Sequence, residues 1–187
     1  MMGHINNLVV EMVRDSLGAE AVDRLFAEAG LEARRYQPEV IYPEEEFQAL
    51  FRGAQAVFGV AADAAEEAFA GYFMKRSPEM FPAIFEQAGS ARGLIERIPT
   101  IHRNFPASAS QGDYRDKVVI TESRPERIVL HYMSPNQLCE TLQHVAKITL
   151  DYFGERGAVR ETSCQKDGAP HCNIVVEFHG AKEPVGA

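Results

Sequence analysis

The spacing of apolar residues changes once along this chain, near residue 106, and that change constrains the fold more than any other feature. Before it, apolar residues recur every three or four positions, as Phe47, Phe51, Ala54 and Phe58 do, which predicts amphipathic helices. After it, short runs rich in β-branched residues predict strands, with one helical segment between the second and third run. The expected strands are residues 117–123, 127–133, 158–164 and 172–178, and the expected helix is residues 136–153.

This order of elements predicts an α+β fold. About six helices in a part spanning about residues 1–106 precede a part spanning about residues 107–180, in which helices pack on an antiparallel sheet. Residues 107–113 are rich in Ala, Ser, Gln, Gly and Asp and predict a loop. The sequence contains no internal repeat and no long low-complexity linker, so residues 1–187 are expected to form a single domain.

Charge and motifs exclude several classes of function. The net charge is -8 and no basic patch is interleaved with aromatic residues, which argues against a nucleic-acid partner. No apolar run approaches the roughly 20 residues of a membrane-spanning helix, and the N-terminus does not resemble a secretory signal, so a cytoplasmic protein is expected. The sequence has no glycine-rich phosphate loop, nucleophile elbow or His-Glu-x-x-His motif, so we expect no enzymatic activity.

His102 is the first candidate for a functional residue. It stands four residues after Ile98, at the edge of an apolar helical face that includes Leu94, Ile101 and Phe105, so its side chain is expected to point toward the core or a pocket. A neutral imidazole facing an apolar cavity can bind iron. The same spacing also suits a hydrogen-bonded core histidine, and the spacing does not decide between the two.

Tyr132 and Ser134 are the second candidates. On an extended segment their side chains point the same way, and together they can present two hydroxyl groups to an acidic ligand. A structural role is the alternative, in which Ser134 caps the following helix and Pro135 is its first residue.

The three cysteines are the third candidates. Cys164 and Cys172 flank a predicted turn and should lie close together, and Cys139 stands in the first turn of the preceding helix. Three thiolates suit a tetrahedral zinc site, for which Glu161 or His171 would be the fourth ligand. The alternative is three packed thiols without a metal.

Taken together, these residues resemble a known family, the heme nitric oxide/oxygen binding (H-NOX) domains. The resemblance covers nearly the whole chain and implies a pocket for heme b between the helical part and the sheet. It places His102 at the position of the proximal iron ligand. The residues that carry the resemblance, besides those already named, are Met1, Gly3, Glu11, Met12, Val13, Tyr42, Pro43, Glu45, Ala68, Phe69, Tyr72, Ser77, Pro78, Glu79, Phe81, Leu138 and Gly168.

The resemblance also implies how the heme propionates are held. Tyr132 and Ser134 match the first two residues of the family's Tyr-x-Ser-x-Arg motif, but Asn136 stands where the arginine belongs, and a neutral amide cannot replace a bidentate guanidinium. Arg115 stands where relatives usually have a proline. We expect Arg115, or Arg103, to supply the missing positive charge.

The cysteines match a structural zinc site of one bacterial branch of the family. The resemblance implies Cys139, Cys164 and Cys172 as ligands, with Glu161 in the place of a histidine. His171 is the competing fourth ligand.

The function implied is that of a heme-based nitric oxide sensor. Oxygen-binding relatives have a distal tyrosine near the position of Thr141, where this chain has none. In the implied switch, nitric oxide weakens the bond between iron and His102, the helix shifts, and a separate histidine kinase or cyclic-di-GMP enzyme responds. The alternatives are a heme-free zinc and thiol redox sensor on the same fold, or a module that binds another small apolar molecule.

Overall fold

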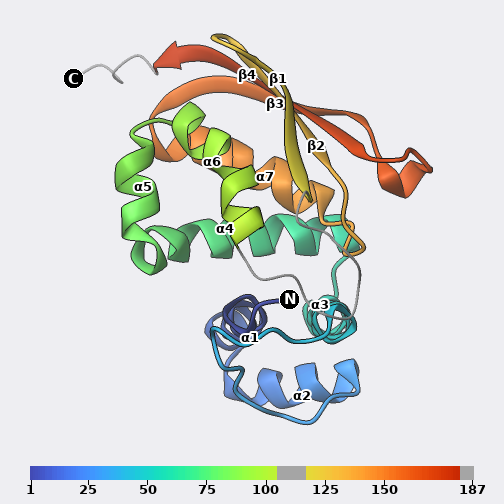
Figure 1. Cartoon of the computed structure of the whole chain (residues 1–187). Coiled ribbons are helices and arrows are strands. Elements are labelled where there is room, and N and C mark those ends of the chain that lie inside the picture. Colours follow the sequence, from blue (N-terminus) through green and yellow to red (C-terminus); the bar gives the residue numbers. More distant parts are fainter. Residues whose placement is uncertain (105–116, 182–187) are drawn as a thin grey trace. The chain divides into compact units, whose positions relative to one another are not determined.

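A computed structural model describes residues 1–104 and 117–181 (Figure 1). The chain divides into two compact units, here named unit 1 (residues 1–73) and unit 2 (residues 74–104 and 117–181), and the boundary falls inside a helix. That all 187 residues act as one domain stays a prediction. The helices are α1 (Gly3–Leu17), α2 (Ala19–Ala29), α3 (Glu44–Phe58), α4 (Ala62–Met80), α5 (Pro82–Ala88), α6 (Ala91–Asn104) and α7 (Cys139–Tyr152), and the strands are β1 (Val118–Arg124), β2 (Arg127–Tyr132), β3 (Glu155–Ser163) and β4 (Cys172–Ala181).

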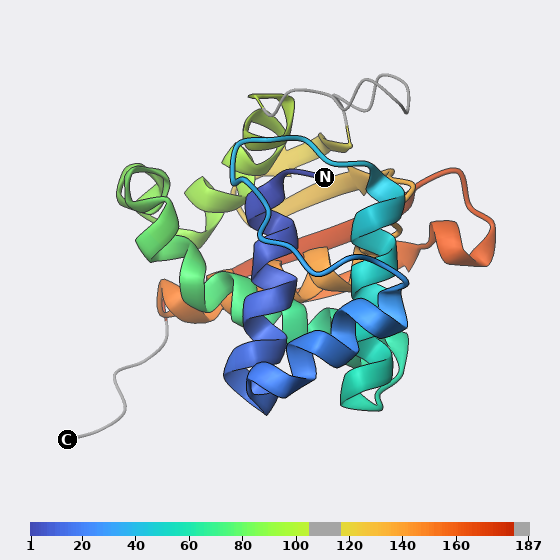
Figure 2. The same cartoon turned by 90° about the horizontal axis from the view of Figure 1, so that it is seen from below.

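Unit 1 is a helical body in which α1, α2 and α3 pack on one another. Its core includes the rings of Phe47, Phe51 and Phe69, whose centroids lie 5.7–6.3 Å apart. The segment after α2 crosses the start of α1, as Figure 2 shows, and the Gly3 N–H donates to the Val40 carbonyl at 2.8 Å. The approach is so close that a Cβ at Gly3 would lie 2.1 Å from the carbonyl oxygen of residue 37, so only glycine fits there.

Unit 2 is built on a four-stranded antiparallel sheet with the order β1-β2-β4-β3. Alternate residues of β2 and β4, such as Leu130 and its β4 partner Ile174, belong to the core of unit 2, so one face of the sheet is apolar. Helices α6 and α7 pack on the sheet (Figure 1). Their core residues are Ala91, Ile95, Cys139, Leu142, Ala146 and Leu150. The predicted α+β fold with an antiparallel sheet is confirmed.

Several predicted boundaries are wrong. Strand β3 begins at Glu155 rather than at residue 158, and β4 ends at Ala181 rather than at residue 178. Helix α7 begins at Cys139 rather than at residue 136, and Ser134 does not cap it. Residues 134–137 form a turn instead, in which the Gln137 N–H donates to the Ser134 carbonyl at 3.1 Å and Gln137 has a positive φ of 49°. The predicted loop at residues 107–113 lies outside the described residues. Within the described ranges, no helix combines the length and the apolar character that crossing a membrane requires.

Candidate functional site

His102 lies in the last turn of α6. It follows the buried Ala91, Ile95 and Pro99 at helical spacing, so it continues the face of α6 that packs in the core of unit 2. Burial, assisted by the positive charge of Lys117, lowers the pKa of His102 to about 4. The imidazole is therefore neutral at pH 7, and it forms no hydrogen bond with any residue in the described part of the chain. A ring in this state has one nitrogen whose lone pair is available to bind a metal.

The other end of α6 is fixed to the β1–β2 hairpin by Arg92. Its Nη1 donates to the carbonyl oxygens of Arg124 and Pro125 at 2.5 and 3.1 Å, and its Nη2 donates to Ser123 Oγ at 2.7 Å. The guanidinium carbon also lies 5.5 Å from the centroid of the Phe178 ring on β4. The first turn of α6 is thus held by two strands of the sheet.

Pro99 separates the two ends of this helix. It lies inside α6 and has no N–H to donate to the Ile95 carbonyl, so one helical hydrogen bond is missing between Arg92 and His102. Pro99 is the point at which the His102 half of α6 can bend most easily relative to the half that Arg92 holds.

Tyr132 and Ser134 lie at the end of β2 and in the following turn, and both are buried, with 6% and 3% of their surface exposed. The Tyr132 hydroxyl accepts from the Leu138 N–H at 3.1 Å, and the Ser134 hydroxyl accepts from the Asn136 N–H at 3.3 Å. Each hydroxyl thereby organises the turn that follows β2.

The structure describes only some of the other residues that were expected near the heme. Arg115 lies outside the described residues. Arg103 follows His102 directly and is exposed, and Asn136 is partly buried in the turn. Thr141 is buried in the first turn of α7.

The three cysteines meet as predicted. Cys139 Sγ lies 3.6 Å from Cys164 Sγ, which lies 3.9 Å from Cys172 Sγ. One carboxylate oxygen of Glu161 completes a group of four atoms that all lie within 4.8 Å of one another. Tetrahedral zinc with Zn–S bonds of 2.3 Å requires sulfurs about 3.8 Å apart, so the donor set fits zinc.

The protonation of Cys139 and Cys172 depends on whether a metal ion is bound. Burial above all raises the pKa of Cys139 to about 12 and raises that of Cys172 as well, so these thiols stay protonated unless a metal stabilises the thiolates. Gln143 Nε2 donates to Glu161 Oε2 at 3.3 Å, a partner that the sequence analysis missed. Glu161 Oε1 is buried and has no hydrogen-bond partner among the described residues.

His171 has a different neighbour. Its ring stacks on that of His131, with centroids 4.1 Å apart and an interplanar angle of 20°. Among the described residues, it is Glu161 and not His171 that groups with the cysteines.

Comparisons with known proteins agree with this architecture. Matching structures include the ferrous nitric oxide complex of an H-NOX protein from S. oneidensis (TM-score 0.80, 17% identity, 96% of this chain and 100% of that chain). They also include the unliganded ferrous H-NOX protein from K. algicida (0.77, 16%, 100% of both chains) and the oxygen complex of an oxygen-binding H-NOX domain related to soluble guanylate cyclases (0.76, 18%, 100% of both chains).

Sequence comparison identifies the family more directly. No curated protein has significant sequence similarity to the chain. At identities below 20%, the matching structures establish the fold alone. The model of the haem-NO-binding family, however, matches residues 2–161, which is most of the chain. The chain therefore belongs to the haem-NO-binding (H-NOX) family, whose domains bind heme and sense gases.

Proposed function

We propose that this protein is a heme-based nitric oxide sensor that binds heme b through His102. The observation that carries the proposal is the state of that side chain: a partly buried, neutral imidazole, without a hydrogen bond to any described residue, on the apolar side of α6. A hydrogen-bonded core histidine, the alternative in the sequence analysis, would have a polar partner.

Tyr132, Ser134 and Asn136 are proposed to contact the heme propionates. The Ser134 hydroxyl keeps a hydrogen to donate, and hydrogen bonds from backbone N–H groups hold both hydroxyls in place. The positive charge that Asn136 does not provide is assigned to Arg115, with exposed Arg103 as the alternative.

Heme held by His102 would supply a ferrous iron that binds nitric oxide. The chain's own part in signalling is the response of α6. Arg92 holds the first turn of α6 to the hairpin. A change in the force on His102 would therefore bend α6 at Pro99. The half of α6 that bears His102 then moves against a fixed sheet.

The preference for nitric oxide over oxygen follows from hydrogen-bond donors. Bound oxygen needs a strong donor, whereas nitric oxide does not. Helix α7 carries one tyrosine, Tyr152, which is its last residue, is 51% exposed and contacts Phe85. Thr141 is the remaining and weaker donor near the position expected from oxygen-binding relatives.

Cys139, Cys164, Cys172 and Glu161 are proposed to bind structural zinc. The metal would stabilise the thiolates and pin the turn between β3 and β4 to the start of α7. The family match favours this structural role over a heme-free redox sensor. The sensor itself is proposed to be non-catalytic and to act on a separate histidine kinase or cyclic-di-GMP enzyme.

Anaerobic absorption spectroscopy tests the gas specificity. The purified protein, reconstituted with hemin and reduced, is exposed in turn to nitric oxide and to air. We expect a Soret band that shifts with nitric oxide and no stable oxygen complex. A stable oxygen complex would contradict the specificity, and a protein that cannot take up heme but holds stoichiometric zinc would favour the redox sensor.

A further inference from the structure

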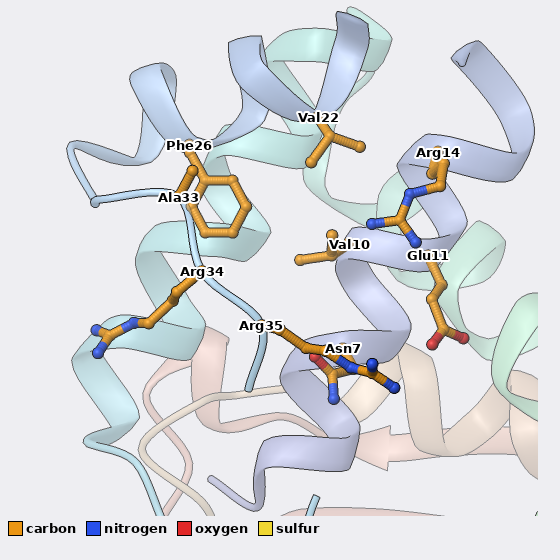
Figure 3. Close-up of a pocket in the computed structure, with 9 residues that line it drawn as sticks. All are labelled: Asn7, Val10, Glu11, Arg14, Val22, Phe26, Ala33, Arg34 and Arg35. Atoms are coloured by element: carbon orange, nitrogen blue, oxygen red, sulfur yellow. The ribbon is translucent and has the colours of Figure 1, made fainter. Parts of the chain in front are cut away.

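A pocket of about 500 Å³ is lined only by residues of unit 1. Figure 3 shows it between one face of α1, the facing side of α2 and the segment that follows α2. Its volume falls in the range of pockets that hold small molecules, about 300–1,000 Å³. Its lining residues are Asn7, Val10, Glu11, Arg14, Val22, Phe26, Ala33, Arg34 and Arg35.

The centre of the pocket is apolar. Val10 on α1 and the Phe26 ring on α2 face each other across it, with Val22 one turn before Phe26 on the same helix (Figure 3). Val10 and Phe26 are buried and belong to the core, so this surface is fixed by the packing of unit 1. Such a surface favours an apolar ligand body.

Two arginines stand beside this apolar surface without partners. Asn7, Val10 and Arg14 share one face of α1, so Arg14 lies at one end of the pocket and Arg35, beside Asn7, at the other (Figure 3). Both are exposed, and in the described part of the chain neither guanidinium forms an ion pair or hydrogen bond.

The neighbouring charged residues are already engaged. Arg34 points away from the pocket in Figure 3 and pairs with Glu46, which also accepts from the Tyr36 hydroxyl at 2.9 Å. Glu11, the one acidic residue of the lining, has its own interaction elsewhere. Arg14 and Arg35 are therefore the positively charged lining residues that can still pair with a ligand, in a protein whose net charge is -8.

We propose that this pocket binds a small amphipathic carboxylate. The apolar body would lie against Val10, Val22 and Phe26, and the carboxylate would pair with Arg14 or Arg35. A neutral apolar ligand would cover the guanidiniums without giving them a partner, which is unfavourable. A planar carboxylate matches the guanidinium fork and can accept two hydrogen bonds from it.

Matched ligands test the proposal on the full-length heme-loaded protein. The probes are hexanoate, benzoate and 4-phenylbutyrate, each paired with its uncharged carboxamide, and binding is followed by ¹H–¹⁵N NMR titration. At least one acid should bind with saturable shifts on α1 and α2. It should bind about tenfold more tightly than its amide, the factor that one charge-assisted hydrogen bond provides.

Variants then locate the site. Arg14→Gln or Arg35→Gln should reduce the affinity for the acid to that for the amide, whereas Arg24→Gln, an exposed α2 arginine outside the lining, should leave it unchanged. Val22→Trp should abolish binding by filling the pocket. The variant spectra check the fold. Absence of saturable binding by every acid, equal affinity for acid and amide, or full affinity in both glutamine variants would overturn the proposal.

Discussion

Replacing Arg92 with methionine should destabilise the protein more than replacing any other surface residue of α6. Methionine keeps an unbranched apolar stem in the same place, so the loss isolates the guanidinium. That group is only 26% exposed and donates to two carbonyl oxygens of the β1–β2 hairpin and to Ser123 Oγ. It also lies over the Phe178 ring.

The magnitude follows from these contacts. Partly exposed hydrogen bonds contribute toward the low end of the usual range, roughly 0.5–1 kcal/mol each, so three of them contribute about 2 kcal/mol. The cation–π contact adds about 0.5 kcal/mol, and the surface ion pair with Glu96 adds little. The expected loss is therefore about 2–2.5 kcal/mol, equivalent to a fall in Tm of roughly 4–10 °C for a chain of this size.

Urea unfolding of the heme-loaded protein measures this loss, with Arg97→Met as the matched control. Arg97 lies on the same helix but makes a single exposed hydrogen bond, to the Gln87 carbonyl at 2.9 Å, and its loss should cost about 0.5 kcal/mol. If both variants lose the same free energy, or Arg92→Met loses less than about 1 kcal/mol, the reasoning that α6 is anchored at Arg92 is refuted.

Three further predictions test other parts of the molecule. Cys164→Ser should reduce zinc, measured by mass spectrometry, from one per chain to a small fraction; unchanged zinc would contradict the ligand set. Gly3→Ala should cost more than about 2 kcal/mol in urea unfolding because its Cβ meets a backbone oxygen, and a neutral effect would contradict the packing at α1. Burial lowers the pKa of His4 below its ordinary 6.5, so its contribution to stability is present above that pH and is lost as acidification charges the buried ring; an NMR-titrated pKa of 6.5 or more would contradict this.

The sheet could be predicted from sequence because its signals are local. Runs rich in β-branched residues, such as Ile128 and Val129, define the strands, and the turn between Cys164 and Cys172 determines that their thiols approach. The start of α7 could not be placed, because Ser134 and Pro135 suit either a helix cap or a turn. The positive φ of Gln137 that selects the turn has no sequence signal comparable to a glycine.

The sequence indicated candidate site residues but not the contacts that support them. The apolar spacing around His102 indicated burial, and the structure adds the lowered pKa. The role of Arg92 was not predictable, because its acceptors are backbone carbonyls about 30 residues away that any sequence provides. That Glu161 rather than His171 lies with the cysteines also required the structure, since both are close to the cysteines in sequence, but Glu161 lies on β3 and His171 stacks on His131.

The most direct test of the central claim is the absorption spectrum of His102→Gly, reduced and reconstituted with heme, before and after adding imidazole. If His102 holds the iron, the variant should have an altered Soret band, and free imidazole should restore the wild-type band by occupying the space that the side chain leaves. A variant whose ferrous and nitric oxide spectra are identical to those of wild type, with or without imidazole, would contradict the account.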